Sequence, residues 1–565
     1  MKSIGRSSGV LVLVASLGWA VVAACGSDAK STFGNGTDSG AETSAGPTFG
    51  DPTGDGSTSF ADFGGAALID TGDGGAGSTT TPANAADLFT AASAAGGDAG
   101  NGNSPCLSEP EVGSLVPRNW LRPRFSWAAA DDANLFEIRV NASNQTNDLV
   151  VYTTASQWIM PKDMWTSFAS HSAGADITVS IRGGKLANGA VTGVTQGSQG
   201  AWGIAPVDAP GSIVYWYIAG NLGELKGFSV GDEDTRVVLK PTDVQKDQVC
   251  IGCHTSSPDG KFALLSLDTN SNWGASIGSI ETDSVGTKPT YMTAAAATSL
   301  TGKLNGITTA SAAFWMTGKH YVAAARGDIN KLSYVNLDDP AGKLTDLEMT
   351  GTNGKQPASP AWSHDGKRFA FTNGALKDGR VEGKTNDIYT APFQEDGSSV
   401  AAGPLTGAAT ADGNEYYPTF SPDDSLIAFT RASKDDNSYA AASAEVLVVG
   451  ANGGTPQRLA ANDPPACAGQ VSPGIENSWP KWAPAGTSKK IGDKTYYWLV
   501  FSSTRHAAPD KSVKRQLFMA PVVVDAAGNI AQYKAVYLWN QPAAESNHTP
   551  AWDVFAIPPS TGGIK

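Results

Sequence analysis

Five residues in the middle of the chain carry the clearest chemistry in the sequence. Residues 250–254 read Cys-Ile-Gly-Cys-His. Two thiols separated by two residues can add to the vinyl groups of a haem, and the adjacent imidazole can ligate its iron, when one short turn presents all three groups to one face of the ring. The spacing therefore predicts one covalent haem c, with Cys250 and Cys253 as thioethers and His254 as the proximal iron ligand.

Two other chemistries fit the same thiols. Cys250 and Cys253 can form a disulfide, or they can bind a metal ion as a thiol pair. A redox-active pair of this spacing is typical of a helix start near a βαβ unit, which the surrounding sequence does not suggest. A zinc site would need further Cys or His ligands, and there is no second Cys-x-x-Cys. The haem is the preferred interpretation and implies electron transfer, with the disulfide as its main alternative.

An internal repeat begins beside this motif. Stretches similar to Pro-x-Trp-Ser-Pro-Asp-Gly-Lys recur, and each is followed by an alternating apolar run. An inner strand that ends in a tight Asp-Gly turn and returns as an alternating strand explains this pattern. The copies, with residues 313–319 as a degenerate one, are Ser257–Lys261, Pro360–Lys367, Pro418–Asp424, Pro480–Gly486 and Pro550–Asp553.

The repeat resembles that of TolB-type β-propellers and covers most of residues 209–557. This resemblance implies a six-bladed propeller whose first blade starts near residues 212–217 and whose last strand, near residues 550–552, closes the ring. Propellers of this kind serve binding as well as chemistry. The second functional hypothesis is therefore a scaffold without haem that holds envelope proteins or cell-wall polymer.

The alignment of the repeats also suggests where a haem would lie. His254 falls level with the proline that leads into an innermost strand, so the haem would lie at the mouth of the central funnel. His548 precedes such a proline in an equivalent loop and is the candidate distal ligand, with His506 as the runner-up. His364 and Met316 fall in turns at the other end and are disfavoured. An open sixth position, or a loop histidine bonded to backbone, is the alternative.

The N-terminus carries an export signal. Lys2 and Arg6 precede an apolar run that ends in Val-Ala-Ala-Cys at Cys25. Small residues before a cysteine resemble a bacterial lipobox, which implies a signal peptide over residues 1–24 and a lipid on Cys25. A plain secretory signal is the alternative. The protein is expected in the cell envelope, on the periplasmic or surface side of the outer membrane, in contact with redox or envelope partners.

The remaining segments complete an all-β prediction. Residues 25–105 are rich in Gly, Ser, Thr and Asp and are predicted to form a disordered tether. Residues 106–208 alternate apolar and polar positions, and they resemble a fibronectin type III or Ig-like β-sandwich. The propeller follows over 209–557, and residues 558–565 are a tail. Cys106 and Cys467 are left over, and in an oxidising compartment they can pair.

Several function classes are disfavoured. The net charge is −14 without a basic cluster, which argues against nucleic acid as a partner. Gly274–Gly278 matches the Gly-x-Ser-x-Gly motif of hydrolases, but it lies in a propeller blade rather than in an α/β sheet. Gly72–Gly77 matches a dinucleotide motif, but neither a strand nor a helix flanks it.

Overall fold

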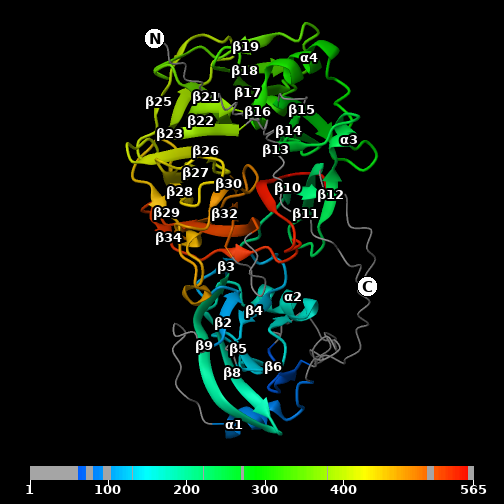
Figure 1. Ribbon diagram of the computed structural model, residues 1–565, viewed down its shortest axis with the longest axis vertical. Coiled ribbons are helices and arrows are strands. Elements are labelled where there is room, and N and C mark those ends of the chain that lie inside the picture. Colours follow the sequence, from blue (N-terminus) through cyan, green and yellow to red (C-terminus); the bar gives the residue numbers. More distant parts are fainter. Residues whose placement is uncertain are drawn as a thin grey trace, which may run out of the picture.

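The structure is a computed structural model that describes residues 62–70, 80–92, 104–129, 132–219, 222–268, 273–377, 380–505 and 514–557. The expected signal peptide, the lipidation site Cys25, most of the tether, His506 and the tail lie outside the described residues. Two β-rich parts follow each other along the long axis of the molecule (Figure 1). Within the described ranges, no helix is both long and apolar enough to cross a membrane.

The first part is a sandwich of two sheets. One sheet has three strands, β2 (Cys106–Glu109), β4 (Arg124–Ala128) and β7 (Gln157–Ile159). The other has the order β1 (Leu68–Ile69), β6 (Leu149–Thr153), β5 (Leu135–Ala142), β8 (Ile177–Ala187), β9 (Ala190–Ile204) and β3 (Leu115–Val116). Two helices accompany the sheets, α1 (Ala85–Ala91) and α2 (Lys162–His171).

The second part is a propeller, and Figure 1 looks roughly along its channel. Within the described residues six innermost strands surround the channel: β36 (Asn547–Asp553), β13 (Ile251–Ser256), β16 (Asn305–Thr309), β21 (Gln356–Trp362), β26 (Gly413–Phe420) and β30 (Ser478–Trp482). The expectation of an all-β chain with a sandwich before a six-bladed propeller is confirmed at this level.

Further strands of each blade lie outward from its inner strand. The first two blades add β10 (Ser212–Ala219), β11 (Leu222–Ser229) and β12 (Arg236–Leu239) to β36, and β14 (Phe262–Asp268) and β15 (Trp273–Ser279) to β13. The next two add β17 (Tyr321–Arg326), β18 (Lys331–Asn336) and β19 (Leu344–Asp346) to β16, and β22 (Arg368–Lys377), β23 (Arg380–Pro392) and β25 (Gly403–Pro404) to β21. The last two add β27 (Leu426–Ser433), β28 (Glu445–Gly450) and β29 (Gln457–Arg458) to β26, and β32 (Lys494–Ser503), β33 (Gln516–Val524), β34 (Ile530–Ala531) and β35 (Val536–Tyr537) to β30.

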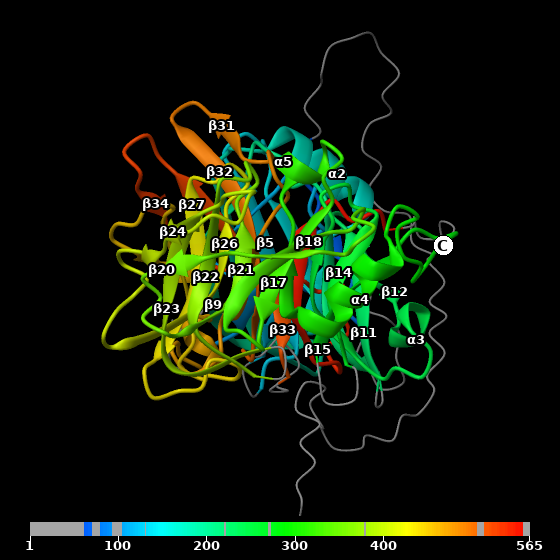
Figure 2. The ribbon, with the colours of Figure 1, turned by 90° about the horizontal axis from the view of Figure 1, so that it is seen from above.

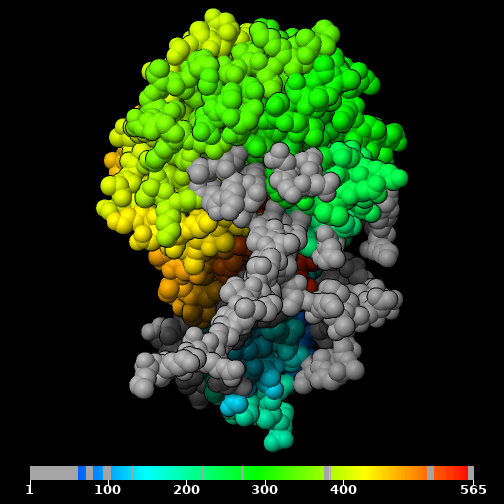
Figure 3. Space-filling model, turned by 45° about the horizontal axis from the view of Figure 1, so that its top comes forward, coloured from blue at the N-terminus to red at the C-terminus, as the bar shows by residue number. Residues whose placement is uncertain are grey.

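Short elements occupy the connections. These are β20 (Met349–Thr350), β24 (Val400–Ala401), β31 (Lys489–Ile491), α3 (Pro241–Val244), α4 (Ala294–Lys303), α5 (Ala312–Trp315) and the 3-10 turns η1 (Ala460–Asn462) and η2 (Ala466–Ala468). In Figure 2 the blades are seen from the side, with β31 and α5 at the upper end of the propeller strands. In the space-filling view, the part of the propeller drawn in green and yellow has a rounded outline (Figure 3).

The ring is closed by its last strand. β36 pairs antiparallel with β10, so that Trp552 lies opposite Ile213 and Asp553 opposite Ser212. The C-terminal strand is therefore the innermost strand of a blade whose other strands begin at residue 212. The expected closure is observed, and the strand at 212–217 is the second strand of its blade.

One feature of the inner strands recurs in five blades. The residues Cys253, Ser359, Tyr417, Trp479 and Thr549 all have positive φ angles, from 44° to 59°. At each of them the pairing register with the next strand shifts. Such a β-bulge bends the strand and changes the direction of its side chains. The bulge residues of three blades, Cys253, Tyr417 and Trp479, pack into one apolar cluster.

A second repeated feature forms the turns after the inner strands. The hydroxyl group of Ser257 donates a hydrogen bond to the carboxylate of Asp259, and its oxygen accepts a hydrogen bond from the backbone N–H of Phe262 at 3.0 Å. The same pair of contacts recurs at Ser363 and Asp365, and at Ser421 and Asp423. These turns gather at one end of the channel, which we call the turn end. The Ser-x-Asp spacing of the repeat is thus a local capping device for the tight turn.

The sandwich and the propeller share a packed junction. One hydrophobic cluster runs through both parts, and the rings of Trp120 and Trp552 are 5.9 Å apart. The indole N–H of Trp539 donates to the carbonyl of Arg122 at 2.9 Å. Cys106 in β2 and Cys467 in η2 form a disulfide with a Cα–Cα distance of 5.6 Å. Core packing and a covalent bond therefore join the two parts.

Candidate functional site

The cysteines and histidine of the predicted haem motif lie around the start of β13, in an extended segment rather than in a short turn. Cys250 is 1% exposed and belongs to the apolar cluster between the first two blades, together with Trp216 and Leu225. Cys253 packs against a different cluster, the one around Tyr417 on the channel side. The two sulfur atoms therefore contact separate regions, and no disulfide joins Cys250 to Cys253.

His254 is bound to a neighbouring blade. Its ring is 3% exposed, and Nε2 lies 3.0 Å from the backbone carbonyl of Val214 in β10. A carbonyl only accepts hydrogen bonds, so Nε2 carries the proton and donates it. The register of β10 against β36 shifts after Val214, and His254 supplies the partner that this carbonyl needs. Burial lowers the pKa of His254 to about 4, although the hydrogen bond to Val214 opposes this shift.

This arrangement does not fit a covalent haem. Attachment needs both sulfurs and the imidazole on one face of the ring. Here the two sulfurs lie in different clusters and the nitrogen that would ligate iron is engaged with Val214. We therefore derive no redox step through these residues. The haem stays a prediction that a spectrum can test.

The candidate distal ligand His548 occupies a different place from the one expected. It is the second residue of β36, not part of a loop, and it lies next to the bulge residue Thr549. Its ring is 3% exposed and meets Trp216 edge-on, with 4.5 Å between ring centroids. Burial, then the charges of Arg515 and His254, lower its pKa. Among the described residues, no three His, Cys, Asp or Glu side chains are grouped as metal ligands would be.

A cavity opens on the channel at the turn end. This cavity of about 190 Å³ is lined by residues from all six inner strands. One residue from each strand occupies the same repeat position around the cavity, and five of these six are small or uncharged. The six are Thr255, Thr309, Ala361, Thr419, Lys481 and Ala551.

Three ionisable side chains line this cavity. Lys481 in β30 has a pKa lowered to about 8 because burial outweighs the attraction of Asp553 and Cys253. Asp553 in β36 has a raised pKa, because burial outweighs a backbone hydrogen bond and the charges of His364 and Lys481. His364 follows β21 and has a raised pKa, because its contact with Asp424 outweighs burial. One amine, one carboxyl and one imidazole thus share the mouth of the channel.

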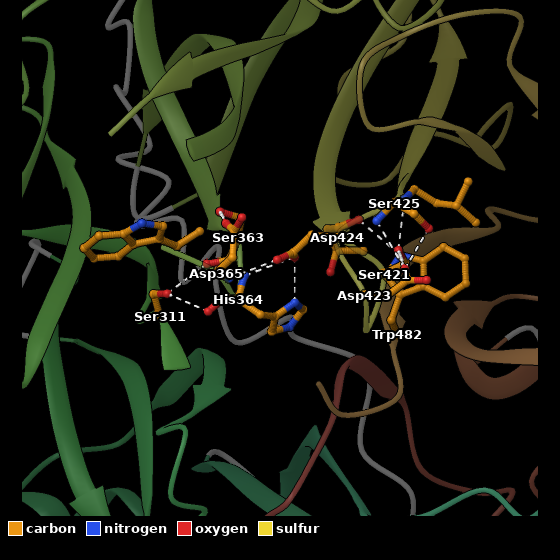
Figure 4. A network of polar contacts seen from close by, with 12 residues as sticks. Ser311, Ser363, His364, Asp365, Ser421, Asp423, Asp424, Ser425 and Trp482 are labelled. Atoms are coloured by element: carbon orange, nitrogen blue, oxygen red, sulfur yellow. Dashed lines mark hydrogen bonds and ion pairs between the residues drawn. The ribbon is translucent and has the colours of Figure 1, made fainter. Parts of the chain in front are cut away.

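His364 is held by the neighbouring blade, as Figure 4 shows. Asp424 accepts the ring Nδ1–H of His364 at 2.7 Å and the backbone N–H groups of His364 and Asp365 at 3.0 and 2.9 Å. Asp424 stands at the repeat position of Gly260 and Gly366 and has a φ of 58°. The aspartate therefore adopts the left-handed backbone conformation of the turn. Its carboxylate also forms hydrogen bonds to the turn of the neighbouring blade.

The sequence interpretation placed His364 at the correct end but dismissed it, and it did not single out Lys481 or Asp553. One feature of the sequence could have identified them: each is a charged residue at a repeat position where the other copies have a small or polar residue. Lys481 corresponds to Ala361 and Thr419, and Asp553 corresponds to the turn serines. A comparison of copies position by position would have selected both.

No family model and no curated protein matches the chain. Among solved structures it is similar to TolB from Acinetobacter baumannii, with 18% identity over 60% of this chain and 66% of that chain, and a TM-score of 0.35. An ancestral GH74 enzyme matches at 10% identity over 60% of this chain and 40% of its own, with a TM-score of 0.33. A GH43 endo-arabinanase from Bacillus licheniformis matches at 10% identity over 57% of this chain and 92% of its own, with a TM-score of 0.23. At these identities the likeness concerns the fold alone.

Proposed function

We propose that this chain is a binding protein of the cell envelope, anchored through a lipid on Cys25, that holds its ligand at the turn end of the propeller channel. The observation that carries the proposal is the ring of six equivalent inner-strand positions around one cavity. Small side chains at five of them leave the space open, and Lys481 adds charge. Convergent polar groups in a concave, largely preformed site are typical of binding sites.

The alternative of electron transfer has less support. The groups that would attach a haem lie in two separate clusters, and His254 is engaged with another blade. Hydrolysis has no support either, because Ser276 of the Gly-x-Ser-x-Gly match is 2% exposed in the middle of strand β15. A nucleophile needs an exposed turn. Binding is therefore the role that the contacts favour.

A bulky substitution that blocks the mouth of the channel tests the proposal. Ala310 lines the cavity and is half-buried at the edge of an apolar cluster, so the bulk of Ala310→Trp is expected to narrow the mouth. The matched control is Val249→Trp, since Val249 is 49% exposed before β13, at the other end of the channel. Ligands are sought by saturation-transfer NMR with a defined set of amino acids, dipeptides, monosaccharides and cell-wall fragments.

We expect ligands of the unmodified chain to be lost in Ala310→Trp and kept in Val249→Trp. Both variants must retain the melting temperature of the parent within a few degrees. Ligands that bind equally to the plugged chain, or a chain to which no member of the set binds, would contradict a binding role for this mouth.

A further inference from the structure

Two charged residues that line the cavity at the turn end, Lys481 and Asp553, are not paired with each other. Within the described part of the chain, the side-chain Nζ of Lys481 makes no hydrogen bond and has no carboxylate oxygen within 4.0 Å. An ammonium group has three donors and is costly to hold in a partly buried place without an acceptor. Its donors therefore remain available to a molecule in the cavity.

Asp553 offers the complementary capacity. One of its oxygens accepts the backbone N–H of Val554 at 2.8 Å, and the other has no partner among the described residues. Lys481 and Asp553 belong to β30 and β36, which are inner strands of adjacent blades in contact with each other. A cationic and an anionic group thus line one cavity from neighbouring strands.

His364 adds a third polar atom on the opposite side. Its Nδ1 is held by Asp424, so the ring orientation is set, and Nε2 has no partner in the described residues. The walls between these groups are short or rigid: Pro360, Ala361, Ala483, Pro484 and Ala551. On the scale where one water needs roughly 10–15 Å³, a cavity of about 190 Å³ has room for a small organic molecule.

We propose that the mouth binds a small zwitterion, an amino acid or a short peptide, whose carboxylate contacts Lys481 and whose ammonium group contacts Asp553. This inference rests on the proposed function and adds the ligand class. The summed charge of Lys481 and Asp553 is zero, so a simple anion or cation would satisfy one group and leave the other without a partner. A zwitterion satisfies both, and charge-assisted hydrogen bonds are the stronger kind.

Isothermal titration calorimetry with four probes tests the assignment. Glycine and glycylglycine carry both charges, N-acetylglycine lacks the ammonium group, and glycinamide lacks the carboxylate. We expect at least one zwitterion to bind at least tenfold more tightly than either blocked analogue. A preference for glycine would indicate a free amino acid as the ligand, and a preference for glycylglycine would indicate a peptide.

Two variants then test the roles of the side chains. Lys481→Gln is expected to remove the preference for a carboxylate, so that glycinamide binds as well as the zwitterion. Asp553→Asn is expected to remove the preference for an ammonium group, so that N-acetylglycine binds equally well. The controls are Lys489→Gln and Asp493→Asn, which change exposed residues of the blade that carries Lys481 and should keep the parent's order of affinities.

The outcomes separate this inference from the proposed function. If all four probes bind with equal affinity, or if none binds while other ligands bind and are lost in Ala310→Trp, the zwitterion is wrong and the mouth remains a binding site. If the probes bind equally to Ala310→Trp, the mouth itself is not the site and both proposals fail.

Discussion

At the scale of residues, the Cys-x-x-Cys-His sequence is explained by its place in a blade. Cys253 stands at the bulge position held elsewhere by Ser359, Tyr417, Trp479 and Thr549. His254 stands where those copies have proline. The histidine has a structural role, because its imidazole donates a hydrogen bond to the carbonyl of Val214 in the blade that closes the ring. The same five letters can thus describe a strand that joins two blades.

Because His254 is buried and neutral, it makes the fold sensitive to acid. Its pKa is lowered to about 4, whereas an unfolded histidine has a pKa near 6.5, so the unfolded chain binds the proton more tightly. The free energy of unfolding should therefore fall as the pH drops from about 6.5 to about 4, by up to about 3 kcal/mol. His548 contributes in the same direction, because its pKa is also lowered.

The substitution His254→Pro isolates this contribution. The backbone accepts proline at this position in four other copies, so the variant should fold. At pH 7 we expect a loss of about 1–3 kcal/mol, because the carbonyl of Val214 loses its buried partner. Between pH 6.5 and 4 the variant should lose less stability than the parent. Urea unfolding at pH 7 and pH 5 measures both effects, and an equal loss on acidification would refute the assignment.

At the scale of elements, the turns after the inner strands contact one another around the mouth. Asp424 reaches from one turn to the backbone and imidazole of the next, and Ser311 donates to the carbonyl of Ser363 at 2.9 Å. Gly486 donates its backbone N–H to the carbonyl of Pro422 at 2.8 Å. These contacts hold the edge of the candidate site in one shape, which lowers the ordering cost of binding.

The substitution Asp424→Asn tests this contact. Asparagine tolerates the left-handed conformation, so the turn should persist. The negative charge beside the imidazole of His364 is lost. We expect a destabilisation of about 1–2 kcal/mol from weakened hydrogen bonds. The pKa of His364 is raised in the folded parent, so the stabilisation is present below about pH 6.5 and is lost as the pH rises through the folded value.

Nuclear magnetic resonance titration of His364, with thermal unfolding at pH 6 and pH 8, would measure this effect. In Asp424→Asn the imidazole should titrate at lower pH than in the parent. Asp435→Asn, at an exposed position of the same blade, is the control and should titrate as the parent does. An unchanged titration of His364 in Asp424→Asn would show that the contact with Asp424 does not affect the pKa of the imidazole.

At the scale of the whole molecule, the sandwich and propeller form one packed body. The Cys106–Cys467 disulfide closes a loop of 361 residues between the two parts, beside a shared hydrophobic cluster. Glu109 at the junction pairs with Arg124, and burial raises its pKa to about 6 against the attraction of that arginine. The sandwich is therefore a rigid base for the propeller rather than a mobile appendage.

Removal of the disulfide should lower the stability of the chain and weaken the association of the sandwich with the propeller. For Cys106→Ser with Cys467→Ser we expect a loss of about 2–5 kcal/mol, because the cross-link restricts the unfolded chain. Differential scanning calorimetry should show the single transition of the parent broaden or divide into two. A reducing agent should lower the parent's melting temperature and leave that of the double variant unchanged. Equal melting of parent and variant would contradict a stabilising role.

Much of the fold could be predicted because the repeat is periodic. The copies from Ser257 to Asp553 share turn chemistry, so the blades and the ring closure follow from the sequence. Helix α2 could not be predicted in the same way, because its pattern lies among alternating strand segments. The candidate site was missed because its residues are far apart in the chain and meet only where six strands converge. The sequence spacing of the haem motif alone does not distinguish a tight turn from a β-bulge, so the haem stays a prediction.

The most direct test of this account is the absorption spectrum of the full-length chain, produced with c-type maturation factors and recorded in pyridine and alkali after denaturation. Because the sulfur atoms of Cys250 and Cys253 lie in different clusters and His254 is bound to Val214, we predict no covalently bound haem. One haem per chain that survives denaturation and is lost in Cys253→Ala would contradict the binding-propeller account and establish a cytochrome.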